Sequence, residues 1–320
     1  MNSFGKELVF TSFGESHGRA IGGVLDGVPA GITIDLDMIR RELDRRSGRS
    51  HGHCAGVSPR ALEESDEVEW LSGVLDGVTL GTPIAFIIRN TNMRSEDYEW
   101  LKHHYRVGHA DWVYERKYGI RDWRGGGRAS ARETAGRVVA GCIARQLLAV
   151  RGIHIQAQLI QVGEETRKEL FESYIATIQK QGDSVGGIIQ CKVIGLPVGI
   201  GEPIFDKLQS HLAYAIMSIN ACKGFDYGSG FAGVGLLGSE ANKVSGGIVG
   251  GITDGTPLMF RCVFKPTPST PKALQALCPD DKQVHHGRFD ACVAVRAVPI
   301  VEAMTALVLI NEFAHVANKH

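Results

Sequence analysis

The chain has 320 residues, of which 43% are hydrophobic and 22% charged, a composition typical of a soluble globular protein with a sizeable core. Its 35 Lys and Arg residues balance its 35 Asp and Glu residues, which argues against a general nucleic-acid-binding protein. We expect neither a signal peptide in residues 1–13 nor a membrane span, because no run of 18 apolar residues occurs. The seven cysteines include no Cys-x-x-Cys pair, so we expect free thiols in a reducing compartment, by default the cytoplasm.

The first expected element is a strand over Glu7–Phe13, followed by the sequence GESHG at residues 14–18. Two glycines around Ser16 and His17 predict a tight loop that presents both side chains. A Ser-His pair alone says little about chemistry, since most such pairs have no catalytic role.

Two short sequences recur along the chain. GVLDGV at residues 23–28 returns at residues 73–78, and GTP at residues 81–83 returns at residues 255–257. An Asp-Gly pair between apolar runs predicts a β-hairpin turn. We therefore expect repeated antiparallel hairpins, which reflect either a duplicated β-rich unit or the same turn chemistry arising twice.

A short amphipathic helix is expected over Asp37–Arg46, and it leads into a basic loop that contains Arg49. His51, His53 and Cys54 follow this loop. A closed structural metal site needs four ligands at recognisable spacing, and nothing downstream completes the set. We therefore expect a mobile loop here and no metal site.

The most basic stretch, residues 106–137, carries seven Arg and one Lys against four acids and is interrupted by glycines 125–127. Ser130 and Glu133 then have the spacing of a capping box, and helical spacing of apolar residues continues to Gly152. A glycine loop that leads into a helix N-terminus, with Arg124, Arg128 and Arg132 beside it, predicts an anion site, most naturally for phosphate.

The alternative for residues 106–137 is a solvated basic loop followed by a surface helix. Four Tyr and Trp residues in the stretch argue against that alternative, and glycines favour close approach of the backbone to another group. His109 lies in the same stretch and is of a residue type that titrates near neutrality.

The remainder of the chain alternates between expected strands and helices. In order, these are a strand His154–Val162, a helix Glu165–Gln181, a strand Gly187–Ile194, a helix Phe205–Cys222, glycine-punctuated strands within Phe231–Phe264 and a helix Val298–Ala317. Since no proline- or serine-rich linker separates halves, we expect one α+β domain over residues 1–320 with mainly antiparallel sheets. The long loop Lys265–Asp290 has basic ends, and such loops often close over ligands.

Five stretches together resemble the motifs of the chorismate synthase family, and they are residues 14–18, 108–111, 117–127, 130–136 and 296–299. The resemblance runs from Phe13 to the last helix, with the motifs in the family's order and spacing. It implies helices sandwiched between mainly antiparallel β-sheets, and assembly as a homotetramer.

The resemblance implies a carbon–oxygen lyase of the shikimate pathway, which supplies aromatic amino acid biosynthesis. Enzymes of this family convert 5-enolpyruvylshikimate 3-phosphate to chorismate by an anti 1,4-elimination of phosphate. They need reduced FMN although the reaction has no net redox change. Some members reduce the flavin with NADPH and others rely on an outside supply, and the sequence does not decide between the two. The implied partner is this small-molecule substrate, with neither nucleic acid nor membrane.

The resemblance also assigns roles to residues. His17 would stabilise the anionic reduced flavin, and His109 would protonate the departing phosphate. Asp290 would relay the C6 proton through the flavin, with Ser16 and Ser130 nearby. The residues that would hold the substrate's phosphate and carboxylate are Arg46, Arg49, Arg106 and Arg132. The residues that would line the flavin site are Arg128, Ala129, Ser130, Gly255, Lys265, Pro266, Thr267, Pro268, Ser269 and Arg288.

The sequence departs from the family pattern at Val107, Ala129, Pro268, Phe289 and Ala291. Phe289 removes a polar neighbour of Asp290. The stretches Ser239–Ser245 and Lys265–Gly287 are shorter than the family's, so we expect lower FMN affinity or loop contacts from a neighbouring subunit.

Two other classes of function fit parts of the sequence. A flavin-dependent oxidoreductase acting on a phosphorylated small molecule would bind the same cofactor, but we expect no strand here to lead into a G-x-G-x-x-G sequence. Turnover without net flavin oxidation would separate the two enzymes. An RNA-binding module would show affinity that falls steeply with salt, and the neutral charge argues against it.

Overall fold

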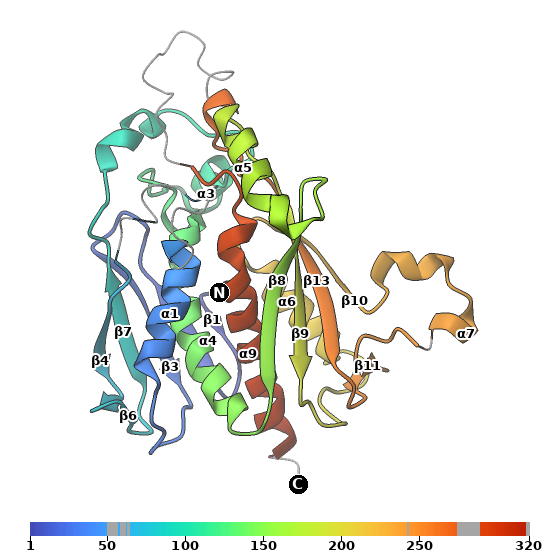
Figure 1. Ribbon diagram of the computed structural model, residues 1–320. Coiled ribbons are helices and arrows are strands. Elements are labelled where there is room, and N and C mark those ends of the chain that lie inside the picture. Colours follow the sequence, from blue (N-terminus) through green and yellow to red (C-terminus); the bar gives the residue numbers. More distant parts are fainter. Residues whose placement is uncertain (50–56, 58–61, 63–64, 242, 274–288, 318–320) are drawn as a thin grey trace.

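Two antiparallel β-sheets face each other across a layer of helices (Figure 1). The computed structural model describes residues 1–49, 57, 62, 65–241, 243–273 and 289–317. One apolar core contains residues from both sheets and from the helices between them. The predicted α+β class, with helices sandwiched between antiparallel sheets, is confirmed.

The first sheet has the strand order β1-β2-β3-β7-β4 and the second β10-β13-β9-β8, and all neighbouring strands pair antiparallel. The strands of the first sheet are β1 Ser3–Phe4, β2 Val9–Phe13, β3 Ala20–Asp26, β4 Val68–Ser72 and β7 Ile84–Arg89. Those of the second sheet are β8 His154–Val162, β9 Gly187–Ile194, β10 Cys222–Tyr227 and β13 Leu258–Phe264. Two small hairpins pair β5 Val74–Leu75 with β6 Val78–Thr79, and β11 Ile248–Val249 with β12 Ile252–Thr253.

The helices fall into a long set and a short set. The long helices are α1 Leu36–Ser47, α4 Thr134–Ala149, α6 Leu208–Met217 and α9 Ala294–Ala317. The shorter ones are α3 Asp111–Tyr118, α5 Phe171–Lys180 and α7 Gly238–Ala241. The 3₁₀ segments are η2 Ser95–Lys102, η3 Gly127–Ala129, η4 Ala131–Glu133, η5 Lys168–Leu170 and η6 Gly230–Gly235.

The two halves of the chain repeat one structural unit. Strands β2-β3-β7-β4 have the same order in the first sheet as β8-β9-β13-β10 in the second. Along the chain, α1 follows β3 in the first unit and α6 follows β9 in the second. The core helices also correspond, because α4 follows β7 and α9 follows β13. Thr79 and Thr253 make matching bonds, because each hydroxyl donates to a proline carbonyl at 2.6 Å and accepts from an isoleucine amide at 2.9 Å. The recurring GTP sequence therefore reflects a duplicated unit, whereas both copies of GVLDGV lie within the first unit.

Helices α4 and α9 cross at the centre of the molecule, where Gly141 meets Ala303. A Cβ at Gly141 would lie 2.3 Å from the Cβ of Ala303, so the glycine sets how closely the two helices approach. Helix α9 has the length and apolar composition of a membrane span over Ala294–Phe313, but 78% of its most apolar stretch is buried inside the protein. Its buried Glu302 accepts hydrogen bonds from Arg45 Nη1 and from the amide of Ala157, both at 2.7 Å. These contacts identify α9 as a core helix.

Only one of the two predicted Asp-Gly hairpins forms. Asp76 and Gly77 connect β5 to β6 with positive φ angles of 48° and 78°, as the sequence predicts. Gly27 instead ends β3, where a Cβ would lie 2.0 Å from the carbonyl oxygen of Glu7. The first prediction is wrong because this glycine serves a close approach between chain segments, not a reversal.

Element boundaries were predicted well for some elements and poorly for others. The strands β8 and β9 have the predicted bounds, and α1 extends the predicted helix by one residue at each end. The helix predicted over Phe205–Cys222 is too long, because the chain turns at Ala221 (φ 66°) and Cys222 begins β10. The strand predicted from Phe231 is wrong, since glycine-rich sequence there forms η6 and α7 before β11 begins.

Candidate active site

Two consecutive glycines seat the two histidines predicted to be catalytic. A Cβ on Gly125 would lie 2.0 Å from Cε1 of His17, and a Cβ on Gly126 would lie 2.7 Å from Cε1 of His109. Both glycines have positive φ angles, 58° and 89°, which disfavour other residues independently of space. The prediction that these glycines serve close backbone approach therefore has a specific explanation: the backbone lies against both imidazole rings.

His17 is buried in the loop that follows β2, with 2% of its surface exposed. Ser16 Oγ lies 3.0 Å from its Nδ1, and the ring of Tyr98 packs edge-on at 4.9 Å between centroids. Asn90 closes this loop, because its Nδ2 donates to the carbonyl oxygens of Glu15 and Gly18 at 3.0 and 2.8 Å. The loop predicted to present Ser16 and His17 is thus held at both ends.

His109 lies in a second cluster with Arg106 and Asp111. Its Nδ1 is 2.8 Å from Asp111 Oδ1. Arg106 donates to both oxygens of Asp111, through Nε at 2.8 Å and Nη2 at 2.8 Å. Burial alone would raise the pKa of Asp111, but hydrogen bonds from Arg106 and His109 outweigh burial and hold that pKa well below its usual range. Asp111 is therefore an ionised acceptor at neutral pH.

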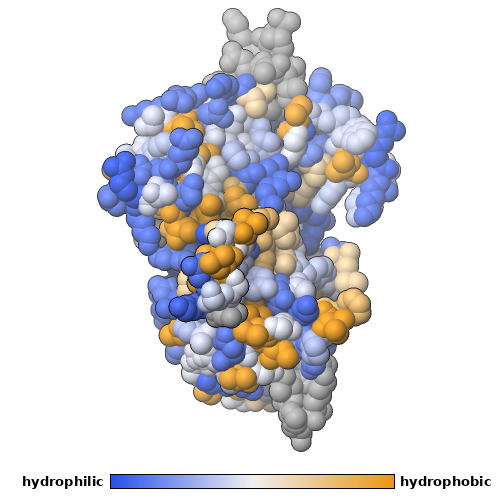
Figure 2. Space-filling model, turned by 90° about the vertical axis from the view of Figure 1, so that its right-hand side faces the viewer, coloured by the Kyte–Doolittle hydropathy of each residue, from blue (hydrophilic) through white to orange (hydrophobic). Residues whose placement is uncertain are grey.

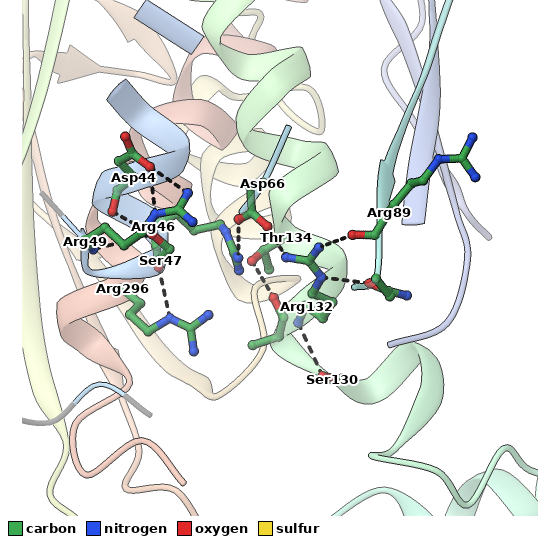
Figure 3. Close-up of polar contacts among 12 residues, drawn as sticks. Asp44, Arg46, Ser47, Arg49, Asp66, Arg89, Ser130, Arg132, Thr134 and Arg296 are labelled. Atoms are coloured by element: carbon green, nitrogen blue, oxygen red, sulfur yellow. Dashed lines mark hydrogen bonds and ion pairs between the residues drawn. The ribbon is translucent and has the colours of Figure 1, made fainter. Parts of the chain in front are cut away.

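A second buried carboxylate, Asp66, lies between two of the arginines predicted to bind substrate (Figure 3). Arg46 Nη2 donates to Asp66 Oδ2 at 2.7 Å, and Arg132 Nη1 donates to Oδ1. The three side chains are at most 5% exposed. Burial alone would raise the pKa of Asp66, but the charges and hydrogen bonds of Arg46 and Arg132 hold it well below its usual range. One carboxylate thus balances two buried guanidinium groups.

Arg132 connects this cluster to the His17 loop. Its Nε donates to Asn90 Oδ1 at 3.0 Å, and its Nη2 donates to the carbonyl oxygen of Arg89 at 3.3 Å (Figure 3). Ser130 Oγ accepts from the amide of Arg132 at 3.3 Å, which is the predicted cap. The other half of the predicted capping box is wrong, because the Glu133 carboxylate pairs with Arg137.

Asp290 is linked to the arginine cluster through Arg296. Arg296 Nη1 donates to Asp290 Oδ2 at 2.7 Å, and its Nε donates to the carbonyl oxygen of Arg46 at 2.9 Å. Arg46, Arg296 and Asn220 line a cavity of about 10 Å³, enough for about one water molecule. Among the described residues, Arg46 Nε and Asn220 Oδ1 are buried without a hydrogen-bond partner. A donor and an acceptor are therefore unpaired on two residues that line this cavity.

The start of the predicted flavin loop lies against the His109 turn. Lys265 Nζ donates to the carbonyl oxygen of Gly108 at 3.0 Å, and a Cβ at Gly108 would lie 3.2 Å from the Cβ of Pro268. Ser184, which lies just before β9, donates through Oγ to the carbonyl oxygen of Thr267 at 2.7 Å and so holds the loop in place. Segments more than 150 residues apart in sequence thus meet at Gly108.

A groove of about 820 Å³ opens beside the glycine loop. Gly126 and Gly127 form part of its wall. The aromatic and cationic side chains that line it are Tyr114, Tyr118, Trp123, Arg121, Arg124 and Arg128. Its volume is in the range of small-molecule sites, which are clefts of roughly 300–1,000 Å³.

Nearly the whole chain is similar to proteins of one family. The family model for chorismate synthase matches residues 8–314. Chorismate synthases of Flavobacterium psychrophilum and Christiangramia forsetii are each 46% identical to it, over 98% of this chain and 97% of theirs. A crystal structure of chorismate synthase matches with a TM-score of 0.74 at 28% identity, over 98% of this chain and 93% of that chain. This chain belongs to the chorismate synthase family.

Membership of the chorismate synthase family fixes the reaction class. The chain is a carbon–oxygen lyase that eliminates phosphate from 5-enolpyruvylshikimate 3-phosphate to give chorismate, within the shikimate pathway. Its substrate is a small molecule, and the family implies a requirement for reduced flavin. The alignment with the F. psychrophilum chorismate synthase spans 350 positions, whereas this chain has 320 residues, so that relative carries segments that this chain lacks.

Two residues assigned from the chorismate synthase resemblance have no recorded contact with His17 or His109 in the described part of the chain. Gly255 precedes β13, at the end of the strand opposite to Lys265, and packs against Val198. Arg49 pairs with Asp44 at 2.6 Å at the end of α1 (Figure 3). Within one chain, neither residue joins the histidine clusters. Two further expectations, the flavin contact of Arg288 and the loop at residues 51–54, lie outside the described residues.

The expectation that no strand leads into a G-x-G-x-x-G sequence is wrong. Strand β10 leads directly into the sequence GSGFAG at residues 228–233, which has the spacing G-x-G-x-x-G. From the sequence we expected a helix to end at Cys222 and the next strand to begin at Phe231. No strand was therefore expected to end at Tyr227, just before this sequence. The structural context differs from a dinucleotide site, because β10 belongs to an antiparallel sheet and η6 follows it instead of a crossover helix.

Four residues that shape the site were given no role from the sequence: Asp66, Asn90, Asp111 and Arg296. Asp111 and Arg296 belong to motifs that carry the chorismate synthase resemblance, so a search for carboxylate partners of His109 would have pointed to Asp111. Asp66 and Asn90 stand in ordinary polar surroundings in the sequence. Asp66 and Asn90 lie 66 and 42 residues from their partner Arg132, and no local pattern indicates these contacts.

Proposed function

We propose that the elimination takes place where Gly125 and Gly126 bring His17 and His109 together. This juxtaposition carries the proposal, because two histidines from segments about ninety residues apart contact consecutive glycines. The arginines that would hold the anionic substrate lie in the adjoining clusters, with Arg106 bonded to Asp111 and Arg132 bonded to Asn90. Planar guanidinium forks suit both phosphate and carboxylate.

We assign the acid role to His109 and the flavin-facing role to His17. His109 Nε2 delivers a proton to the departing phosphate, and Arg106 beside it stabilises the growing negative charge. Asp290 receives the C6 proton, held in place by Arg296. Ser16 lies within hydrogen-bond reach of His17, and Ser130 caps the segment that carries Arg132. These contacts support the roles assigned to both serines.

The cofactor we propose is reduced FMN. Two features of the structure fit it: the groove beside Gly126, lined by aromatic rings and Arg128, and the Lys265–Ser269 loop against the His109 turn. Aromatic side chains suit a flat ring system, and Lys265, Arg128 and the loop hydroxyls suit its phosphate. When bound, reduced flavin supplies electron density that weakens the allylic C–O bond. NADPH or an outside donor keeps it reduced.

We infer that the protein assembles as a homotetramer in the cytoplasm, without nucleic acid or membrane. An arm made of η6 and α7 projects from the second sheet (Figure 1), and Figure 2 shows apolar side chains over it. Phe231, Val234 and Leu237 on this arm are 85%, 96% and 69% exposed. Such apolar exposure in one chain supports contact with another copy. A solution mass equal to one chain would contradict this assembly.

Replacing each histidine tests the proposed roles. His17→Ala and His109→Ala should each lower kcat by ~10²–10⁴, the usual effect of losing an acid–base group. The dissociation constant for substrate should change much less, because neither role is in ground-state binding. His154→Ala, at an exposed histidine at the start of β8, is the matched control and should keep full activity. Wild-type turnover in either site variant would remove that histidine from the mechanism.

A further inference from the structure

We propose that Asp111 is a positioning residue for the elimination, which fixes a proton on Nδ1 of His109 so that Nε2 is the atom that serves the leaving phosphate. This inference rests on the proposed acid role of His109. Neither the residue roles that the resemblance supplies nor the family comparisons assign a function to Asp111.

The proton position is set by three close contacts. His109 Nδ1 lies 2.8 Å from Asp111 Oδ1 and 3.1 Å from Arg106 Nη2, and Arg106 Nη2 lies 2.8 Å from the same oxygen. If Nδ1 carried no proton, its lone pair would face a carboxylate oxygen at 2.8 Å, which is repulsive. With a proton on Nδ1, both nitrogens donate to Oδ1 at 2.8 Å, and the longer 3.1 Å contact only sets the two donors side by side at one acceptor. Without that proton, Nδ1 could accept only the longer 3.1 Å bond from Arg106 Nη2 and would lose the shorter one. The geometry therefore favours the Nδ1–H form.

Asp111 is itself rigidly held. Its side chain is 2% exposed, and the carboxylate also accepts a hydrogen bond from the backbone amide of Arg106 at 3.1 Å. It is the first residue of α3, where the positive end of the helix dipole favours a negative charge. Its low pKa keeps it an acceptor throughout the neutral range. A fixed acceptor of this kind sets both the tautomer and the orientation of a histidine ring.

The opposite edge of the ring is left accessible by Gly126. A Cβ at this position would lie 3.1 Å from His109 Nε2, so the glycine keeps a methyl group away from that nitrogen. His109 is 16% exposed, whereas Asp111 is buried behind it. One edge of the imidazole is thus bound to a carboxylate, and at the other edge no methyl group covers Nε2.

His109 donates one proton and keeps the other during the elimination. The protonated ring holds one proton on each nitrogen, and Nε2–H passes its proton to an oxygen of the departing phosphate. The C3–O bond breaks with its electron pair on that phosphate. The C6 proton passes to Asp290, the electron pair of the C6–H bond forms a C6–C1 double bond, and the existing C1–C2 double bond shifts to C2–C3. His109 returns to the neutral Nδ1–H form, still bonded to Asp111. The same tautomer is kept throughout, and only Nε2 exchanges its proton.

Asp111→Asn tests this positioning, because an amide can turn its NH₂ toward Nδ1 and favour the wrong tautomer. We expect kcat to fall about 10–10²-fold, the range for losing an outer partner of a functional histidine. In a His109→Ala background the same change should lower kcat no further, because its effect passes through the ring. Asp111→Glu keeps the charge and should recover part of kcat.

Asp226→Asn is the matched control. Asp226 also binds an arginine through both oxygens, with Arg261 at 2.9 and 2.6 Å, but in the β10–β13 pair. The Asp226→Asn substitution should leave kcat unchanged. If Asp111→Asn does not fold, ¹⁵N-histidine NMR of the wild-type protein still decides, with the His109 signals assigned from the alanine variant. The neutral ring should carry its proton on Nδ1.

Three results would overturn the inference: wild-type kcat in Asp111→Asn, multiplicative losses in the double variant, or a neutral His109 with its proton on Nε2. A different result would refute the proposed function: wild-type activity in His109→Ala would show that His109 is not the acid, whatever the activity of Asp111→Asn.

Discussion

Gly126 and Gly119 share a left-handed backbone but differ in what surrounds them. Their φ angles are 89° and 75°. A Cβ at Gly126 would lie 2.7 Å from His109 and 3.1 Å from Arg106 Nη2, whereas a Cβ at Gly119 would meet nothing within 4 Å. At this scale, a residue without a side chain determines where the side chains of His109 and Arg106 can lie.

Comparing alanine variants of Gly126 and Gly119 separates the cost of the left-handed backbone from the effect of a methyl group on the position of His109. Gly126→Ala and Gly119→Ala should each cost ~1–2 kcal/mol of folding free energy for the left-handed conformation. Only Gly126→Ala should also lower kcat, by about 10²-fold, because it displaces the ring of His109. Urea unfolding and steady-state turnover measure the two effects. Equal kcat in the two variants would show that Gly126 has no role in seating the histidine.

Asp66 gives the protein a specific dependence on pH. A carboxyl group with a lower pKa in the folded protein than in the unfolded chain adds stability at pH values above its unfolded pKa of about 3.9. That contribution is lost progressively as the pH falls toward the lower folded pKa. Asp66 has such a depressed pKa because of Arg46 and Arg132. Its stabilisation should therefore be complete at neutral pH and decline below about pH 4.

Asp66→Asn should lower the free energy of unfolding at pH 7 by ~3–5 kcal/mol, because two buried guanidiniums lose their counter-charge. The variant should also lose less stability than the wild type between about pH 4 and pH 2, since it lacks this titrating group. Urea titrations at several pH values measure both effects. Asp226→Asn, at a more exposed pair, should cost about 1 kcal/mol or less. Parallel acid slopes in wild type and Asp66→Asn would contradict the argument.

At the scale of elements, the duplicated unit explains why the GTP sequence appears once in each half. Gly27 and Gly195 occupy matching positions, where a Cβ would lie 2.0 and 2.1 Å from a carbonyl oxygen of the preceding segment. Both glycines follow the second strand of their unit and lead into a Pro-x-Gly-Ile sequence. The threonines that bind this sequence stand at equivalent places in β6 and β12.

Thr79→Val and Thr253→Val should therefore have equal costs. Each removes a hydroxyl from a buried site and leaves an isoleucine amide and a proline carbonyl without that partner, which costs ~1–3 kcal/mol. Because the sites lie in different sheets, the double variant should show the sum of the two costs within about 0.5 kcal/mol. Thr177→Val, at an exposed helical threonine, is the control and should change little. Clearly unequal costs would argue against structural equivalence.

Local patterns predicted those elements that are regular throughout their length. The strands β8 and β9 alternate buried and exposed residues, and α1 lies between Asp35 and Gly48, two strong caps. Prediction failed at Cys222 and Phe231, where apolar residues continue across a turn. Glycine there indicates that an element ends but not which type of element comes next. The sequence therefore predicts element type better than element ends.

The site was predictable only as far as its residues share a motif. The glycine loop, His109 and the cap at Ser130 could be read from one stretch of 32 residues. His17 and Asp290 came from the family resemblance, and their neighbours depend on contacts across the whole chain. Asn90, for instance, joins the His17 loop to Arg132 through bonds that only the folded sheet creates. Such contacts leave no trace in local sequence.

At the scale of the whole molecule, the site lies between equivalent connections of the two repeated units. Residues 90–133 connect β7 to α4 and carry His109, whereas residues 265–293 connect β13 to α9 and carry Lys265 and Asp290. The two connections meet where Lys265 bonds to Gly108. The duplicated sandwich thus brings its two corresponding connections together beside the proposed site, which His17 joins from the loop between β2 and β3.

The most direct test of this account is anaerobic turnover of 5-enolpyruvylshikimate 3-phosphate with photoreduced FMN. An elimination without net redox change should give many equivalents of chorismate for each flavin, one phosphate released per chorismate, and a flavin spectrum that remains reduced after the substrate is consumed. Flavin oxidation in step with product, or product limited to one equivalent per flavin, would contradict an elimination without net redox change.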